Sequence, residues 1–188
     1  MTPRLSAMLG GILALVVVAA APAADWQIDA PRSKLEFVAT FKSAKASGVF
    51  RSFDARVRFD PDHPADNHID VTIAVASADM IDAEVNQAIR GPEWFDAARH
   101  PQAAFHSNDI RTLGANRYLA HGTLALKGIE LPVDVPFAWS GAAGAATMTG
   151  ELSVKRADFH IGTGEWAPTD IIGADVVVKF SVRLRKDG

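Results

Sequence analysis

Apolar and polar residues alternate over most of the chain beyond residue 23, and this alternation predicts β-strands. The apolar residues of each segment share one face, whereas charged residues such as Arg56, Lys179 and Arg183 occupy the other. About eight such strands predict an antiparallel sheet with one solvated face and one apolar face. The clearest segments are residues 35–41, 55–59, 69–75, 118–126, 131–137, 147–155 and 176–184.

A sheet of this size has to bury its apolar face, and a small domain does so by closing into a barrel or folding into a sandwich. We expect a barrel. Two helical pieces interrupt the strands: residues 82–89, which end before Gly91-Pro92, and a weaker turn at residues 158–170. The sequence therefore predicts a mainly β fold with one or two short helices.

Two bulky aromatic residues, Trp94 and Phe95, lie on a short connector between predicted strands. Such connectors are usually polar and solvated. An apolar surface must therefore lie beneath these two side chains, and the inside of the barrel is the surface that the pattern provides.

The first 23 residues are typical of a secretory signal peptide. Arg4 precedes an apolar run at residues 9–20, and Ala21-Pro22-Ala23 supplies small residues for cleavage after Ala23. We expect residues 24–188 to form one exported domain, with a retained membrane anchor as the alternative. The chain has no cysteine, which excludes a lipid-modified cysteine and disulfide bonds.

Charge and composition narrow the function classes. The chain has 19 Lys and Arg residues against 22 Asp and Glu residues, a net charge of −3. A domain that binds nucleic acid needs a basic face, so this balance argues against one. An exported domain without disulfide bonds is stabilised by its apolar core, which fits the periplasm better than the extracellular medium.

The sequence contains no catalytic or metal-binding motif. A serine nucleophile elbow, His-Glu-x-x-His, a P-loop and Gly-x-Gly-x-x-Gly are all absent. The six histidines lack the spacing that directs a pair to one metal ion, so scattered surface histidines are the simpler interpretation. His106 and His121 are the pair to consider if they fall on adjacent strands.

Phenylalanine is frequent at inward positions of the predicted strands. A filled core explains any single one of these residues. An eight-stranded barrel, however, has an interior that is either filled by side chains or holds one small ligand. Ala39, Ala55, Ala120 and Gly122 leave space at inward positions, which favours a ligand cavity.

Five groups of residues stand in order along the chain. They are Trp26-Gln27-Ile28-Asp29 with Ser33 and Phe37; Gly48-Val49-Phe50 with Phe53 and Phe59-Asp60; Trp94-Phe95-Asp96 with Pro101 and Phe105; Gly122-Thr123-Leu124 with Lys127-Gly128 and Pro132-Val133; and Lys155-Arg156-Ala157-Asp158-Phe159. Together they resemble the YceI-like family of exported polyisoprenoid-binding proteins. The set covers nearly all of residues 24–188, and its order is more specific than any single motif.

The resemblance implies an extended lipocalin-like barrel, commonly a homodimer, without catalytic residues, metal or a required cofactor. Its interior holds an isoprenoid lipid, of the quinone or polyprenyl type. The expected ligand-binding residues are Phe37, Phe41, Phe50, Phe53, Phe59, Val71, Ile73, Val75, Trp94, Phe95, Phe105, Leu124, Leu126, Val133, Val135, Phe137, Leu152, Phe159, Trp166, Val178 and Phe180.

The chain departs from the family pattern at three places. Residues 79–82, Asp-Met-Ile-Asp, replace a turn that is often small and Thr-Gly-like. The Trp94-containing form of residues 90–96 resembles the family branch whose members are often encoded near cytochrome b561-type membrane proteins. Such a membrane protein is therefore a candidate partner. His160 replaces the glycine that usually follows the Asp-Phe pair, at a place where it would narrow the pocket mouth or add a polar contact.

We expect a periplasmic carrier that exchanges its lipid with the membrane during transient surface contact. Lys42, Lys45 and Arg51 near the turn at residues 43–48 are candidate contacts, although a solvated hairpin tip also explains them. Two other functions stay open. One is an enzyme with Asp158, His160 or His106 as acid or base, and the other is a structural barrel with a filled core.

Overall fold

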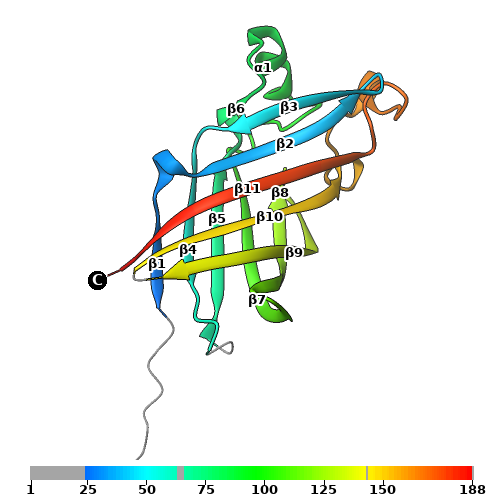
Figure 1. The fold of residues 1–188 in the computed structure, drawn as a ribbon. Helices are drawn as coiled ribbons and strands as arrows, with labels where there is room; N and C mark the ends of the chain where they lie inside the picture. The colour runs from blue at the N-terminus through cyan, green and yellow to red at the C-terminus, as the bar shows by residue number, and fades with distance from the viewer. Residues whose placement is uncertain (1–23, 63–65, 143, 188) are drawn as a thin grey trace, which may run out of the picture.

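The computed structural model describes residues 24–62, 66–142 and 144–187; the predicted signal peptide lies outside them. Antiparallel strands form a closed barrel of eight, extended by three further strands that continue from β11 (Figure 1). The predicted mainly β, eight-stranded antiparallel barrel is confirmed. In ring order the eight are β1 (Asp25–Ile28), β4 (Phe53–Arg58), β5 (His68–Ala74), β7 (Gln102–Gly114), β8 (Arg117–Leu126), β9 (Ile129–Ala142), β10 (Ala145–Lys155) and β11 (Asp175–Lys186), and the extension is β2 (Lys34–Phe41), β3 (Ala44–Phe50) and β6 (Ala78–Asp79).

The barrel is closed at one end and spreads at the other because two of its strands change neighbours. Residues 184–186 of β11 pair with β1, whereas residues 177–181 pair with β2. β9 pairs with β10 only over residues 137–142. Beyond that point the two strands diverge (Figure 1). Pro132 and Pro136 lie in this half of β9, as expected for a strand edge without a partner.

Aromatic side chains fill the closed end. The ring of Phe59 lies 4.8 Å from that of Tyr118 and 4.6 Å from that of Trp139, measured between centroids. Trp26 meets Trp139 edge to face at 5.2 Å, and its indole N–H donates to the carbonyl of Phe59 at 2.9 Å. This cluster forms the floor of the barrel interior.

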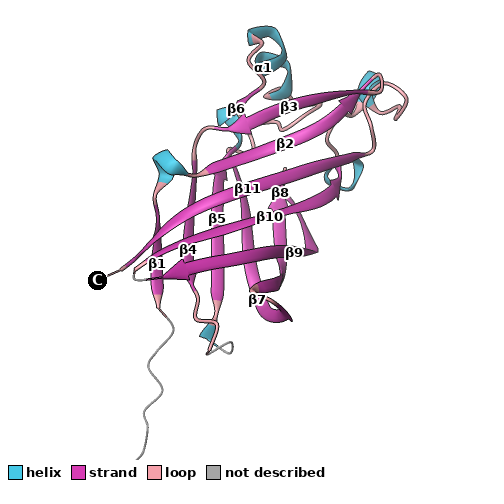
Figure 2. Ribbon diagram, in the orientation of Figure 1, coloured by secondary structure: helices cyan, strands magenta, loops and turns pink. Residues whose placement is uncertain are grey.

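One α-helix lies at the open end (Figure 2). The helix α1 (Ala83–Ile89) begins after Asp82, whose carboxylate accepts hydrogen bonds from the backbone N–H groups of Glu84 and Val85. The predicted turn at residues 158–170 contains 3₁₀ helices instead, η4 (Arg156–Phe159) and η5 (Gly164–Trp166). Others are η1 (Ala30–Arg32) and η3 (Val75–Ser77). In the described ranges, no helix is long and apolar enough to cross a membrane.

Asp79 fixes the corner between β6 and α1. Its carboxylate accepts hydrogen bonds from the backbone N–H of Ile81 and the side-chain amide of Asn86, both at 2.8 Å, and it pairs with Arg51. Asn86 in turn accepts from the backbone N–H of Met80 at 2.7 Å. These bonds, the one from Asn86 first, lower the pKa of the Asp79 carboxyl to about 2. The corner thus depends on an ionised Asp79.

This pKa makes stability depend on pH in the acid range. Because the pKa of Asp79 in the folded state lies below the ordinary pKa of an aspartate, 3.8, the stabilisation is complete above pH 3.8 and is lost as the pH falls towards about 2. We expect Asp79→Asn to lower the midpoint of thermal unfolding at neutral pH, and the difference from wild type to shrink over this range. A difference that stays constant from neutral pH down to pH 2 would contradict this account.

Candidate functional site

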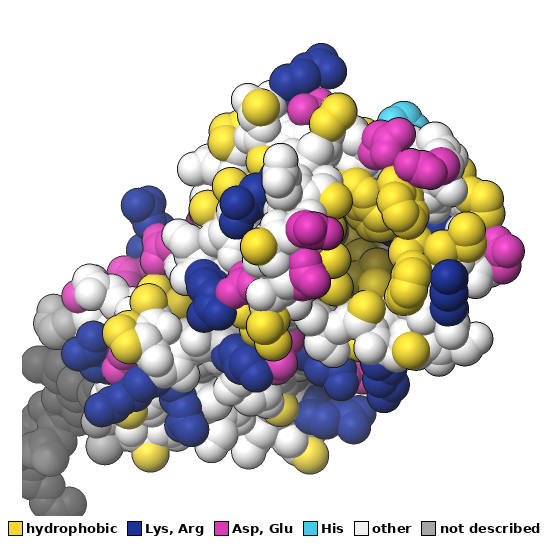
Figure 3. Space-filling view, turned by 90° about the horizontal axis from the view of Figure 1, so that it is seen from above, with side chains coloured by type: hydrophobic (Ala, Val, Ile, Leu, Met, Phe, Trp, Pro, Cys, Tyr) yellow, Lys and Arg dark blue, Asp and Glu magenta, His cyan; other side chains and the backbone are white. Residues whose placement is uncertain are grey.

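An apolar cavity of about 520 Å³ lies in the open half of the barrel. Seen from above, it is a hollow walled by hydrophobic side chains (Figure 3). Thr40 and Arg156 are the only polar residues among the described residues that line it. A cavity of this size with so few polar groups is suited to hydrocarbon.

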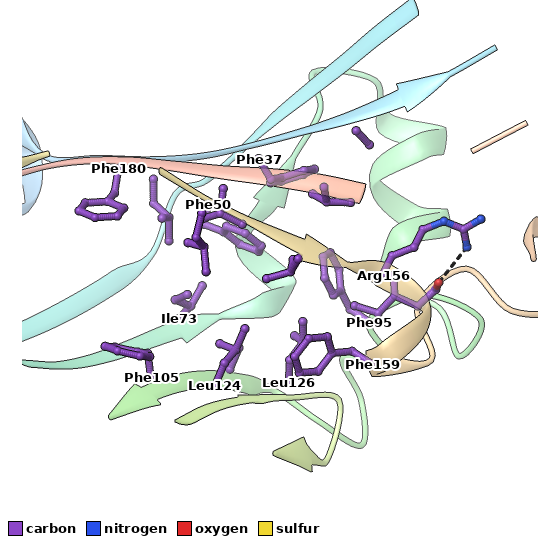
Figure 4. Close-up of a pocket in the computed structure, with 18 of the residues that line it drawn as sticks. Phe37, Phe50, Ile73, Phe95, Phe105, Leu124, Leu126, Arg156, Phe159 and Phe180 are labelled. Carbon is purple, nitrogen blue, oxygen red and sulfur yellow. Dashed lines mark hydrogen bonds between the residues drawn. The ribbon is translucent and has the colours of Figure 1, made fainter. Parts of the chain in front are cut away.

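Most of the predicted ligand-binding residues line this cavity, and they reach it from strands all around the barrel and from the connectors at its mouth (Figure 4). Their contact with a ligand stays a prediction. The lining residues that the sequence predicted are Phe37, Phe41, Phe50, Phe53, Val71, Ile73, Trp94, Phe95, Phe105, Leu124, Leu126, Val133, Val135, Phe137, Leu152, Phe159, Trp166, Val178 and Phe180.

The structure places two predicted residues outside the lining. Phe59 does point inward, but it lies in the aromatic floor below the cavity. Val75 is buried elsewhere because β5 ends at Ala74 and the chain turns into η3, so the alternation of the strand no longer sets its direction. The sequence pattern gives the face of a side chain but not its depth in the barrel.

The sequence prediction missed the contribution of α1. Val85, Ala88 and Ile89 line the cavity together with Met80, which precedes the helix. Their spacing of three and four residues is the signal of an apolar helix face, and it was present in the sequence. α1 therefore forms part of the cavity wall.

The connector at residues 90–100 brings Trp94 and Phe95 to the mouth. Trp94 packs against Trp166 with ring centroids 5.8 Å apart, and Phe95 packs against Phe50 at 5.9 Å. The backbone N–H of Phe95 donates to Ile89, and those of Gly162 and Thr163 donate to Glu93. The two aromatic residues are held in a hydrogen-bonded frame.

Lys127 joins two segments of this frame. Its ammonium group donates to the carbonyl of Pro92 at 2.8 Å and to the carbonyl of His160 at 2.7 Å. Burial lowers the pKa of Lys127, and the nearby Asp96 and Glu93 carboxylates act in the opposite direction. The ion-dipole contacts fix the 90–100 connector to the segment that follows β10.

Arg156 organises the other side of the mouth. Its side chain is 3% exposed and points away from the other lining side chains (Figure 4). Burial lowers the pKa of its guanidinium group, but an arginine stays protonated at physiological pH. Every nitrogen of the guanidinium donates to backbone carbonyls rather than to a carboxylate, and those acceptors are Ile161, Gly162, Trp166, Ala167, Pro168, Ile172 and Gly173. Arg156 therefore shapes the mouth loop and has no donor to offer to a ligand.

His160 is exposed and lies outside the lining, so the expected narrowing of the mouth is not seen. Its backbone is in the left-handed region with φ of +51°, a conformation that glycine adopts freely and histidine tolerates better than most residues. The left-handed turn explains why a glycine suits this position.

Three further histidines, His68, His106 and His121, bond to aspartate side chains on the outside of the barrel. Asp70 bonds to His68 and His106 at 2.8 and 2.6 Å, and Asp134 bonds to His121 at 2.8 Å. His106 and His121 do fall on adjacent strands but bind separate carboxylates. Within residues 24–62, 66–142 and 144–187, no group of three or more His, Asp or Glu side chains is arranged to hold a metal ion.

Residues 26–184 match the family model of the YceI-like domain. A UPF0312 protein of Photorhabdus laumondii is 30% identical over 125 residues, which are 62% of this chain and 65% of that protein. The chain thus spans slightly less than two thirds of that relative. A UPF0312 protein of Yersinia pestis is 30% identical over 154 residues, covering 76% of this chain and 79% of its own length.

Two solved structures share the fold. BcnA of Burkholderia cenocepacia superposes with a TM-score of 0.81 at 37% identity, over 83% of this chain and 98% of that one. A domain of Saccharophagus degradans, described as polyisoprenoid-binding and implicated in plant cell wall breakdown, superposes with a TM-score of 0.70 at 18% identity. That match covers 86% of this chain and 98% of the domain, and it shows likeness of fold alone.

Gly48 faces Phe37, a cavity-lining residue, across the β2–β3 pair. A methyl group at Gly48 would overlap with the ring of Phe37 and lie 2.9 Å from Met80 Cγ, and all of these neighbours are side-chain atoms. We expect Gly48→Ala to turn the Phe37 ring into the cavity, with a stability loss of about 1 kcal/mol.

The measurement is the affinity for geranylgeraniol, which should fall in Gly48→Ala and recover when Phe37→Leu is added. An unchanged affinity in the single variant, or no recovery in the double variant, would show that this contact does not set the width.

Proposed function

The chain belongs to the YceI-like family, and on this premise we propose that it is a periplasmic carrier that holds the tail of an isoprenoid lipid, of the quinone or polyprenyl type. The observation that carries the proposal is the cavity, whose lining is apolar apart from Thr40 and Arg156. The description of the Saccharophagus degradans domain as polyisoprenoid-binding supports the choice of ligand class. The signal-like first 23 residues support the location.

The volume of the cavity sets the length of tail it holds. A protein cavity of about 150 Å³ accepts benzene, which corresponds to roughly 25 Å³ per carbon atom. The volume of about 520 Å³ then accommodates about 20 carbon atoms, or about four isoprene units. A longer tail would extend through the mouth, because the aromatic floor blocks the other end.

Transfer free energies define what such a site does. Removing a CH₂ group from water is worth about 0.8 kcal/mol, so a prenyl tail prefers the cavity to water strongly. A tail that comes from a bilayer gains almost nothing, because it was already in hydrocarbon. The protein therefore carries or buffers a lipid that exchanges reversibly with the membrane.

The head group of the ligand lies at or outside the mouth in this proposal. Among the described residues that line the cavity, Thr40 and Arg156 alone are polar, and every guanidinium nitrogen of Arg156 donates to backbone carbonyls. The cavity thus selects its ligand by the volume and shape of the tail.

The other two functions receive less support. Asp158, His160 and His106, the acid-base candidates, all lie outside the cavity lining. The relatives named above are not named as enzymes. A purely structural role would require a filled core, and only the closed half of the barrel is filled. A homodimer and a cytochrome b561-type partner stay predictions.

The tail-length limit gives a direct test. We expect the affinity for prenyl alcohols, delivered from a cyclodextrin complex, to rise from farnesol to geranylgeraniol and then to level off, because carbon atoms beyond about 20 lie outside the cavity. Native mass spectrometry of the protein purified from the periplasm of its own host should show a bound isoprenoid lipid. Protein that carries no lipid and binds none of the alcohols would overturn the proposal.

A charge in the cavity should abolish binding. Ile73 lines the cavity, whereas its neighbour Thr72 is exposed on the outer face of β5. We expect Ile73→Asp to weaken geranylgeraniol binding at least about tenfold, because a carboxylate would have to be buried against the tail. Thr72→Asp is the matched control and should bind like wild type. Val135→Asp places the same charge in the cavity from β9. If Ile73→Asp and Val135→Asp both fold and still retain lipid at the wild-type level, the assigned lining does not hold the tail.

A further inference from the structure

Three of the four large hydrophobic residues that are exposed among the described residues lie at the open end of the barrel. Ile81 is 94% exposed, Phe41 41% and Val85 38%, and the fourth, Leu113, is at the opposite end on the β7–β8 hairpin (Figure 1). Phe41 and Val85 also line the cavity. The apolar surface therefore runs from the cavity across its mouth to the outside. We call Phe41, Ile81 and Val85 the apolar rim.

Ile81 has a strained backbone conformation, and its side chain makes little packing contact that could offset the strain. Its φ is +73°, in the left-handed region where a β-branched residue is an outlier. A nearly fully exposed side chain gains little packing energy in exchange. Strain of this kind is retained where a residue has a use outside the fold, such as contact with a partner.

The charges near the rim are of both signs. Lys42 lies over the ring of Phe41 at 5.4 Å, and Lys45 follows on β3. Asp82 and Glu84 are acidic groups at the start of α1. Acidic and basic side chains both lie near the hollow in Figure 3. Arg51 is not part of the cationic group that the sequence predicted, because it lies at the other end of β3 and pairs with Asp79. Attraction to anionic lipid is thus a small part of any contact at this surface.

We propose that the apolar rim is a membrane-docking surface: Ile81, Val85 and Phe41 insert among the acyl chains of a phospholipid bilayer and place the cavity mouth against it. The proposal rests on the function proposed above and names the surface that serves it. Lys42 then lies at the level of the lipid phosphates, as expected for a cation beside an interfacial aromatic residue.

The need for docking follows from the path of the tail. A tail that leaves the bilayer through water exposes its CH₂ groups, and each one lowers the equilibrium population of the exposed state by roughly fourfold. Direct contact between the mouth and the bilayer avoids this barrier. Phe41 and Val85 belong both to the cavity lining and to the exposed surface, so a tail can pass beside them without leaving apolar surroundings.

The test compares two delivery routes in the same variants. Geranylgeraniol is supplied either in phosphatidylcholine vesicles or as a cyclodextrin complex, and protein-bound ligand is measured over time after the vesicles are sedimented. Ile81→Asn removes the apolar group with a residue that tolerates the left-handed conformation. Leu113→Asn is the matched control, an exposed residue at the other end.

We expect Ile81→Asn to load about tenfold more slowly from vesicles, the factor that corresponds to burial of one such side chain, and at the wild-type rate from cyclodextrin. Leu113→Asn and the conservative Ile81→Leu should match wild type on both routes. Equal vesicle rates for wild type and for an Ile81→Asn/Val85→Asn double variant would overturn the docking surface. Failure of all proteins to load from cyclodextrin would instead reject the proposed lipid-binding function.

Vesicles of different charge separate insertion of apolar side chains from electrostatic attraction. Because the rim has both signs of charge, adding phosphatidylglycerol to the vesicles should change the wild-type rate less than the Ile81→Asn substitution does. A rate that depends on phosphatidylglycerol and salt but not on Ile81 would assign the contact to the lysines and overturn the apolar rim.

Discussion

The exchange of neighbours along β11 is the constraint on which the cavity depends. An eight-stranded ring is just wide enough to be filled by side chains, and the half of this barrel that β1 closes is filled in that way by Phe59, Tyr118 and Trp139. In the other half β11 turns to β2, and β3 and β6 continue the wall. The divergence of β9 from β10 opens the same end. One sheet thus produces a solid floor and a hollow above it.

The polar groups at the mouth are used to hold the frame, which keeps the lining apolar. Arg156 and Lys127 bring two positive charges close to a hydrocarbon cavity, an arrangement that would be costly if their donors were unsatisfied. Backbone carbonyls of the surrounding loops accept hydrogen bonds from those donors. The charges fix the connectors that carry Trp94, Phe159 and Trp166, while only aromatic and aliphatic groups of these residues face the ligand space.

Sequence periodicity predicted seven of the strands and their inward faces, because side chains alternate strictly along a paired strand. It did not define β1, β3, β6 or β7. Ile73 and Val135 lie in the lining for that reason. The pattern failed where the chain leaves the sheet: Val75 follows the end of β5, and its direction is set by a 3₁₀ turn. Depth along the barrel also escapes the pattern, since Phe59 has the right face but lies in the floor. The role of Arg156 depends on carbonyls up to 17 residues away, a tertiary arrangement that no local sequence signal encodes.

Under the proposed carrier function, a lining that is almost wholly apolar has a consequence for the direction of transport. Because the tail is in hydrocarbon both in the bilayer and in the cavity, its free energy differs little between the two, and the protein alone does not determine where the lipid ends up. The membrane or partner that binds the lipid most tightly determines the direction. In that proposal the protein contributes a lower barrier, through a mouth that is held in place by the hydrogen bonds of Arg156 and Lys127. A fixed mouth of this kind favours exchange in both directions over tight retention, which is the property that a reversible carrier requires.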